Sequence, residues 1–211
     1  RWRRLLNVEE ARLVLDIDDD ALRVQRVLGT TSTEIARLAL TERSALAAQL
    51  EQQLDEDQRA LRRTFLLPTG MVLRRTLPLP AAALDNLRTV LGFELDRQTP
   101  FKPDQVVFDA RVLAHEPGSR QVPVELALVP RDRLQQALDE IDGVASTLGA
   151  VDAKGADARP MGYNFLPPEQ RRQHRNTRAW VHAGLVAASL MFLLIAMGRL
   201  LDNRVGAVAA L

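Results

Sequence analysis

The stretch RLVLDIDDDALRVQRVL, residues 12–28, places two short runs of Leu, Val and Ile on either side of an acidic turn at Asp18, Asp19 and Asp20. Apolar runs separated by a tight polar turn are typical of two antiparallel strands. Residues 34–40 can supply a third strand. The sequence therefore opens with a predicted β-meander.

The rest of the first 152 residues predicts alternating helices and strands. Residues 42–61 carry leucines at near-helical spacing and predict one amphipathic helix. A second predicted helix has the apolar face Leu84, Leu87, Leu91 and Leu95 and ends before Pro100. The remaining predicted elements are strands at residues 64–67, 71–77, 105–113, 121–129 and 150–152, and a helix at residues 131–141.

This order predicts an α/β fold. Three meandering strands followed by a helix and a fourth strand open the ribonuclease H-like and actin-like folds, so we expect a reduced actin-like domain over residues 1–152. Residues 153–159 are small and polar and predict a linker. The linker and a basic segment together extend over residues 153–178.

A predicted membrane anchor follows the basic segment. Residues 179–198 contain no Lys, Arg, Asp or Glu, and twenty helical residues span about 30 Å, the thickness of a bilayer's hydrocarbon core. We expect one transmembrane helix, with residues 199–211 beginning a periplasmic segment. The chain lacks an initial Met, so we also expect it to be part of a longer protein.

The charges around the anchor predict its orientation. Arg171, Arg172, Arg175 and Arg178 precede it, which places the N-terminal domain in the cytoplasm by the positive-inside rule. Trp180 lies at the predicted headgroup level. His182 can reach the same interface, and we favour that reading over a proton relay.

Small residues inside the anchor suggest a way for two helices to pack. Gly184 and Ala188 are four residues apart, and small residues at this spacing allow the backbones of two helices to approach closely. Because alanine-rich spans show such spacing by chance, this strip is a hypothesis.

The composition excludes several classes of function. The chain has no cysteine and a formal net charge of only +1, so neither a disulfide framework nor a cysteine-based zinc cluster is expected. Nucleic-acid binding is not expected either, because phosphate recognition requires concentrated Lys and Arg.

Two further segments resemble known families. The stretch from residue 77 to residue 109 contains Leu-Pro-Leu-Pro, the pair Phe93-Glu94, a Thr-Pro-Phe-Lys-Pro turn and a strand bearing Asp109, and it resembles PilM-type proteins of type IV pili. Residues 161–168, MGYNFLPP, followed by basic residues and one apolar span, resemble the start of PilN, whose short cytoplasmic tail is bound by PilM. The two parts in one chain resemble the L subunit of the type II secretion system.

This resemblance implies a bacterial inner-membrane platform protein with a periplasmic C-terminus. The family implies docking of the cytoplasmic secretion ATPase (the E subunit), pairing with the M subunit in the membrane and periplasm, and a homodimer. It implies no enzymatic activity. A pilus-assembly protein fused from PilM-like and PilN-like parts, and a membrane-tethered nucleotide-hydrolysing enzyme, remain the alternatives.

The acidic residues of the hairpin do not predict a catalytic, cofactor-binding or metal site. Asp16, Asp18 and Asp20 resemble a calcium loop, but Ala21 and Val27 stand where that loop needs Gly and Glu. A two-metal nuclease would need a second carboxylate at the end of the fourth strand, where the sequence is Leu-Leu-Pro. A phosphate-binding hairpin would need glycine instead of carboxylates.

Partner-binding residues are harder to predict. We expect Glu94 to form a salt bridge within the fold rather than to contact a partner. The polar face of residues 42–61 is equally a candidate docking surface for the ATPase and a plain solvated surface.

Overall fold

The computed structural model describes residues 11–116, 118–167 and 189 of the 211-residue chain. The chain divides into two units, Arg1–Gln173 and His174–Leu211, and the elements below all belong to the first. Its strands are β1 (Arg12–Asp18), β2 (Ala21–Leu28), β3 (Thr31–Ala39), β4 (Arg62–Leu67), β5 (Leu73–Pro80), β6 (Val106–Val112), β7 (Gln121–Pro130) and β8 (Ala150–Ala153). Its helices are α1 (Leu46–Gln53), α2 (Glu56–Arg59), α3 (Leu87–Gln98) and α4 (Arg131–Glu140).

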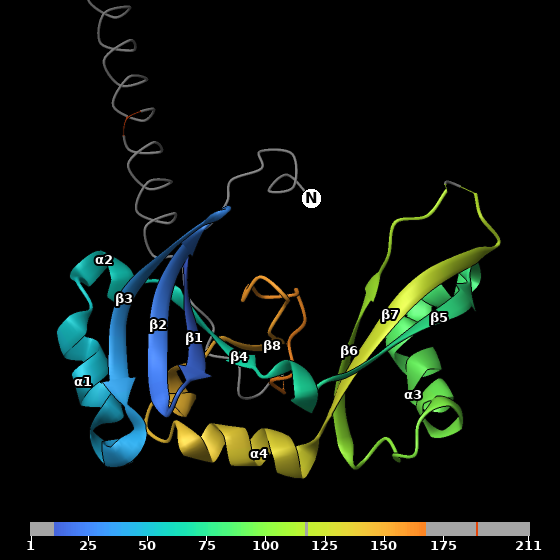
Figure 1. Cartoon of the computed structure of the whole chain (residues 1–211). Coiled ribbons are helices and arrows are strands. Elements are labelled where there is room, and N and C mark those ends of the chain that lie inside the picture. The colour runs from blue at the N-terminus through green and yellow to red at the C-terminus, as the bar shows by residue number, and fades with distance from the viewer. Residues whose placement is uncertain (1–10, 117, 168–188, 190–211) are drawn as a thin grey trace, which may run out of the picture. The chain divides into compact units, whose positions relative to one another are not determined.

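A five-stranded sheet in the order β3-β2-β1-β4-β8 is the larger of the two sheets (Figure 1). The predicted meander is confirmed, because β1 pairs antiparallel with β2 and β2 with β3. Asp19 and Asp20 have φ of 47° and 61°, as a two-residue hairpin loop between paired Asp18 and Ala21 requires. After the helical segment, β4 runs parallel to β1, and β8 runs parallel to β4.

The core lies on one face of this sheet. Leu13, Leu15 and Phe65 are fully buried on that face, and the buried leucines of α1 and α4 pack in the same cluster. The opposite face carries a small apolar group and polar side chains, among them Asp16 and Arg23, which are cross-strand partners on β1 and β2. One face is thus committed to packing and the other is open to polar contacts.

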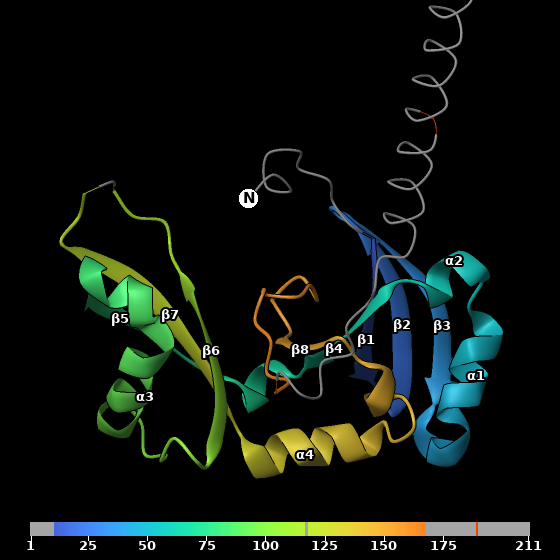
Figure 2. The same ribbon diagram turned by 180° about the vertical axis from the view of Figure 1, so that it is seen from behind.

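The second sheet has three antiparallel strands in the order β5-β7-β6. Helix α3 covers one face of it, where Leu91 and Leu95 pack against Leu77 and Val124 (Figure 2). The prolines of β5 are tolerated because β5 is an edge strand. The other face carries Asp109, Arg111 and Glu125, and this face meets the C-terminal residues of the described unit.

Two predicted helices differ from the structure. The single helix predicted over residues 42–61 is broken at Leu54, whose backbone is extended, because Asp55 and Gln58 form a capping box that starts α2. The helix that carries Leu91 begins at Leu87, and residues 81–86 form a 3₁₀ turn before it. Its predicted end before Pro100 is confirmed.

The predicted linker also differs from the structure in its first part. Ala153 belongs to β8, residues 154–167 follow it without leaving the folded unit, and Tyr163, Phe165 and Leu166 are at most 3% exposed. The orange segment in Figure 1 lies between the two sheets, where residues of both bind it. Residues 168–178, the rest of that prediction, lie outside the described residues.

The buried face of β1 should dominate stability. Leu15→Ala removes a fully buried side chain and is expected to lower the free energy of unfolding by about 2–5 kcal/mol. Leu28→Ala, at a side chain that is 46% exposed, should cost less than about 1 kcal/mol. Urea unfolding of the two variants measures both values, and equal losses would contradict the assignment of the core.

Candidate functional site

The strongest candidate site is the set of residues that bind residues 161–166. We call residues 161–166 the strap. We call the residues that bind it the groove, and these are Arg74, Asp109, Arg111, Glu125, Val151, Asp152 and Ala153. We call the strands and helices β1 to β8 and α1 to α4 the body. Backbone N–H groups of the strap donate hydrogen bonds to carboxylates of the body. Gly162 N and Tyr163 N lie 2.7 and 2.9 Å from the two oxygens of Asp152 on β8, and Asn164 N lies 2.8 Å from Oδ2 of Asp109 on β6. Two carboxylates from different sheets thus bind one short peptide segment.

The strap also forms hydrogen bonds with β8, the edge strand of the five-stranded sheet. Met161 N donates to Ala153 O at 3.2 Å, and Phe165 N donates to Val151 O at 2.8 Å. Val151 N in turn donates to Oδ1 of Asn164 at 3.3 Å. The strap therefore satisfies backbone groups of β8 that would otherwise form a free edge.

Aromatic side chains anchor the strap. Phe165 is fully buried, Tyr163 is 3% exposed, and their ring centroids lie 6.0 Å apart. Both belong to the main apolar cluster, together with Leu166. Burying a large apolar side chain stabilises by roughly 1.5–3 kcal/mol, so these residues contribute more than the peripheral contacts.

A charged network closes over Tyr163. Its hydroxyl donates to Oε2 of Glu125 on β7 at 2.5 Å, and Arg111 pairs with the same oxygen at 2.7 Å. Arg111 also donates to the carbonyl of Met161 at 2.7 Å, and its guanidinium lies 5.2 Å from the centre of the Tyr163 ring. Arg74 lies 3.7 Å from Glu125 on the other side. The strap is thus held by its backbone, its rings and its hydroxyl.

Burial and charge shift the pKa values of these groups in different directions. Burial alone would raise the pKa of Glu125, but the Tyr163 hydroxyl and the arginines more than offset it, so the pKa is lowered. Burial and the neighbouring Glu125 raise the pKa of Tyr163. Burial also raises the pKa of Asp152, because the backbone N–H groups of Gly162, Tyr163 and Ala153 offset it only in part.

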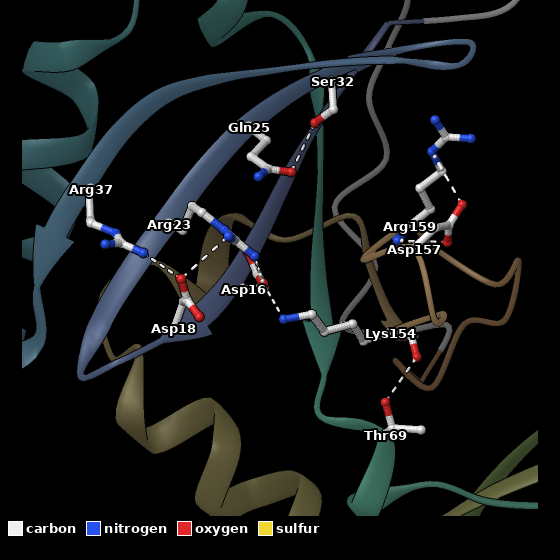
Figure 3. Close-up of polar contacts among 10 residues, drawn as sticks. All are labelled: Asp16, Asp18, Arg23, Gln25, Ser32, Arg37, Thr69, Lys154, Asp157 and Arg159. Atoms are coloured by element: carbon white, nitrogen blue, oxygen red, sulfur yellow. Dashed lines mark hydrogen bonds and ion pairs between the residues drawn. The ribbon is translucent and has the colours of Figure 1, made fainter.

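A second polar cluster links β1 to Lys154, the residue directly after β8 (Figure 3). Asp16, which is 2% exposed, accepts two hydrogen bonds from Arg23, at 3.0 and 2.7 Å, and pairs with Nζ of Lys154 at 2.6 Å. Arg23 also lies 3.3 Å from Asp18, which pairs with Arg37 as well. Burial would raise the pKa of Asp16, but its bonds to Arg23 and Lys154 outweigh burial and lower it.

This second cluster is where a nuclease-like or nucleotide-binding chemistry would have to begin. The carboxylate of Asp16 is engaged by two cationic side chains from the same chain. Within residues 11–116 and 118–167, no three His, Asp or Glu side chains gather in a way that could hold a metal ion. The three aspartates of the calcium-loop pattern lie in different environments, since Asp16 is buried whereas Asp20 lies in the exposed turn.

The residues named in the sequence analysis have different positions relative to the strap. Asp109, noted only as part of a family pattern, binds the strap, and residues 161–166 are the strap itself. Glu94 pairs with Arg97 at 2.9 Å within α3, as expected, whereas its neighbour Phe93 is 78% exposed. Sequence reasoning missed Asp152 and Glu125, because no local pattern marks them.

The predicted membrane residues cannot be placed in this structure. Arg171, Arg172, Arg175, Arg178, Trp180, Gly184 and Ala188 lie outside the described residues. In the part of the chain that the structure describes, no helix has both the length and the apolar character needed to cross a bilayer.

Comparison with known proteins identifies a relative in sequence. The chain is 37% identical over 206 residues to type II secretion system protein L of Xanthomonas campestris pv. campestris, and the match covers 97% of this chain and 54% of that protein. The chain thus spans about half the length of the relative. No protein-family model matches the chain. The resemblance to the L subunit that the sequence predicted is confirmed.

Solved structures are similar in fold. A PilM-PilN type IV pilus biogenesis complex matches with a TM-score of 0.50 and 24% identity, over 68% of this chain and 47% of that one. The cytoplasmic domain of EpsL, an inner membrane component of the type II secretion system of Vibrio cholerae, matches with a TM-score of 0.43 and 16% identity, over 69% and 58% of the two chains. The chain therefore has a mixed α/β fold like that of the pilus complex.

Asp16 should make stability fall at acid pH. Its pKa is lowered in the folded state, so its contribution is present above about pH 4 and is lost as the pH falls through the folded value. At pH 7, Asp16→Asn should cost about 1.5–3 kcal/mol, since it removes the carboxylate that Arg23 and Lys154 share. Urea unfolding from pH 7 to pH 2 measures both effects.

The exposed carboxylate of Asp85 offers the matched control. Asp85→Asn should leave the wild-type pH profile unchanged. A constant difference between wild type and Asp16→Asn across the whole pH range would contradict the role of the ion pairs.

Tyr163 should report whether the strap is docked. It is the chain's only tyrosine, so the phenolate absorption band belongs to it alone. Because its pKa is raised, this band should appear well above pH 10, together with alkaline unfolding. Phe165→Ala, which loosens the strap, should move the step back toward about pH 10. A reversible step near pH 10 in the wild-type protein would show that the hydroxyl is not buried against Glu125.

Proposed function

We propose that this chain is the cytoplasmic and membrane-anchoring part of an inner-membrane platform protein of the type II secretion system. The support is the sequence similarity to protein L, which runs across 206 residues and so extends over most of the basic flank and the apolar stretch as well as the body. The proposed topology has the N-terminal body in the cytoplasm, one span at residues 179–198 and a periplasmic C-terminus, following the four arginines before the span.

The observation that carries the proposal is the docked strap. Residues 161–166 directly precede the basic flank and the predicted anchor, and they are bound to both sheets of the body. A segment fixed by buried rings and carboxylates transmits position from the body to whatever follows it. A mobile linker would not do so, because its ends move independently. Such a fixed attachment suits a protein that couples a cytoplasmic motor to an envelope assembly.

The proposed role is a scaffold rather than an enzyme. The polar face of the five-stranded sheet, where the hairpin carboxylates lie, is engaged by the chain's own cations at Asp16 and Asp18. A nucleotide phosphate approaching there would meet carboxylates and would have to break these ion pairs. Calorimetric titration with ATP should therefore show no saturable binding at micromolar concentrations.

The proposed cytoplasmic partner is the hexameric secretion ATPase. Phe93 on α3 is the most exposed of the large apolar side chains in the described residues, and exposed aromatic side chains are the common anchors of protein interfaces. Further proposed partners are the M subunit, in the membrane and periplasm, and a second copy of this chain.

Co-purification with the ATPase tests this role. The wild-type chain should retain the secretion ATPase and not a pilus-assembly ATPase. Phe93→Ala should weaken the interaction about tenfold or more. Leu28→Ala, on β2 of the five-stranded sheet, is the control and should leave the interaction unchanged. Retention of the pilus ATPase alone would favour the pilus-assembly alternative, and retention of neither would contradict ATPase docking.

A further inference from the structure

The loop between β8 and the strap holds a strained turn. Ala158 has a φ of 58°, in the left-handed region that disfavours residues with a Cβ. The turn is closed by hydrogen bonds from Gly155 N to Arg159 O at 2.8 Å and from Ala158 N to Gly155 O at 3.1 Å. Residues 155–160 therefore fold back on themselves in a conformation that an open loop would not need.

The strap's binding contacts do not depend on that loop. The strap's hydrogen bonds to the body go to β5, β6, β7 and β8, through Arg74, Asp109, Arg111, Glu125, Val151, Asp152 and Ala153. Lys154, immediately before the loop, stays on its own body through Leu67 O and Asp16. A strap with the same sequence could thus make the same contacts if it came from another chain.

We propose that the strap is exchanged between two copies of this chain, so that each groove holds the partner copy's residues 161–166. Residues 155–160 act as the hinge, and opening them relieves the strain at Ala158. In the described residues, the hinge's main contact with the five-stranded sheet is the hydrogen bond from Arg159 to Thr30 O, an exposed contact that opening would break. Six extended residues reach about 20 Å, which sets how near the two grooves must lie.

The balance between closed and exchanged forms depends on local concentration. The exchanged pair keeps every groove contact, so its main cost is bringing two chains together. This step rests on the proposed function, because anchoring both copies in one membrane raises the concentration of one strap at its neighbour's groove.

Disulfide trapping tests the exchange directly, since the chain has no cysteine of its own. Asp109→Cys and Asn164→Cys are placed in two full-length chains with different tags, reconstituted together in liposomes and oxidised. Asn164 N lies 2.8 Å from the Asp109 side chain, so the two positions adjoin. Exchange predicts a disulfide between the two tags. The control pairs Asn164→Cys with Thr89→Cys on α3, which covers the opposite face of the three-stranded sheet, and should give none.

The hinge provides a second readout with the groove untouched. Ala158→Gly removes the strain from the closed loop and should lower the exchanged fraction about fivefold or more. Deletion of Ala156 and Asp157 makes the loop too short to fold back and should make the chain a dimer by mass measurement. The proposal is overturned if disulfides form only when both cysteines are in one chain, or if the deletion variant stays monomeric with its strap docked. A chain that fails these tests but retains the ATPase would overturn the exchange alone.

Discussion

One constraint governs the strap. Its backbone N–H groups can leave water only if the protein supplies hydrogen-bond acceptors for them. Asp152 and Asp109 provide these acceptors from two different sheets. Burying an ionised carboxylate is costly, and the raised pKa of Asp152 shows that its backbone donors do not fully offset that cost. The rings of Tyr163 and Phe165 supply the compensating apolar burial.

The docked strap also links the two sheets of the body. The five-stranded sheet contributes its β8 edge, and the three-stranded sheet contributes Asp109, Arg111 and Glu125. The strap therefore binds residues of both sheets at once. A force or displacement on the following segment would reach both sheets through the same few residues.

Local patterns in the sequence predicted the strands well and the site poorly. The hairpin of residues 12–28 was predictable because its two apolar runs and its acidic turn lie within a few residues of each other. The break before α2 was missed because the leucine spacing continues across it, although Asp55 and Gln58 carry a capping signal. Residues 153–159 were predicted as a linker from their small, polar composition. That composition does not reveal contacts with residues far away in the sequence, such as the contact of Lys154 with Asp16, 138 positions away. The family resemblance, not the periodicity, drew attention to residues 161–166.

Amide hydrogen exchange at Gly162, Tyr163 and Asn164 tests the central claim most directly, because these N–H groups bind the carboxylates of the body. The docked strap predicts that they exchange as slowly as the amides of β4 in the core and that Phe165→Ala accelerates all three together. Exchange at the rate of an unstructured peptide in the wild-type chain would show that the strap is free and that the body is not fixed to the segment that follows it.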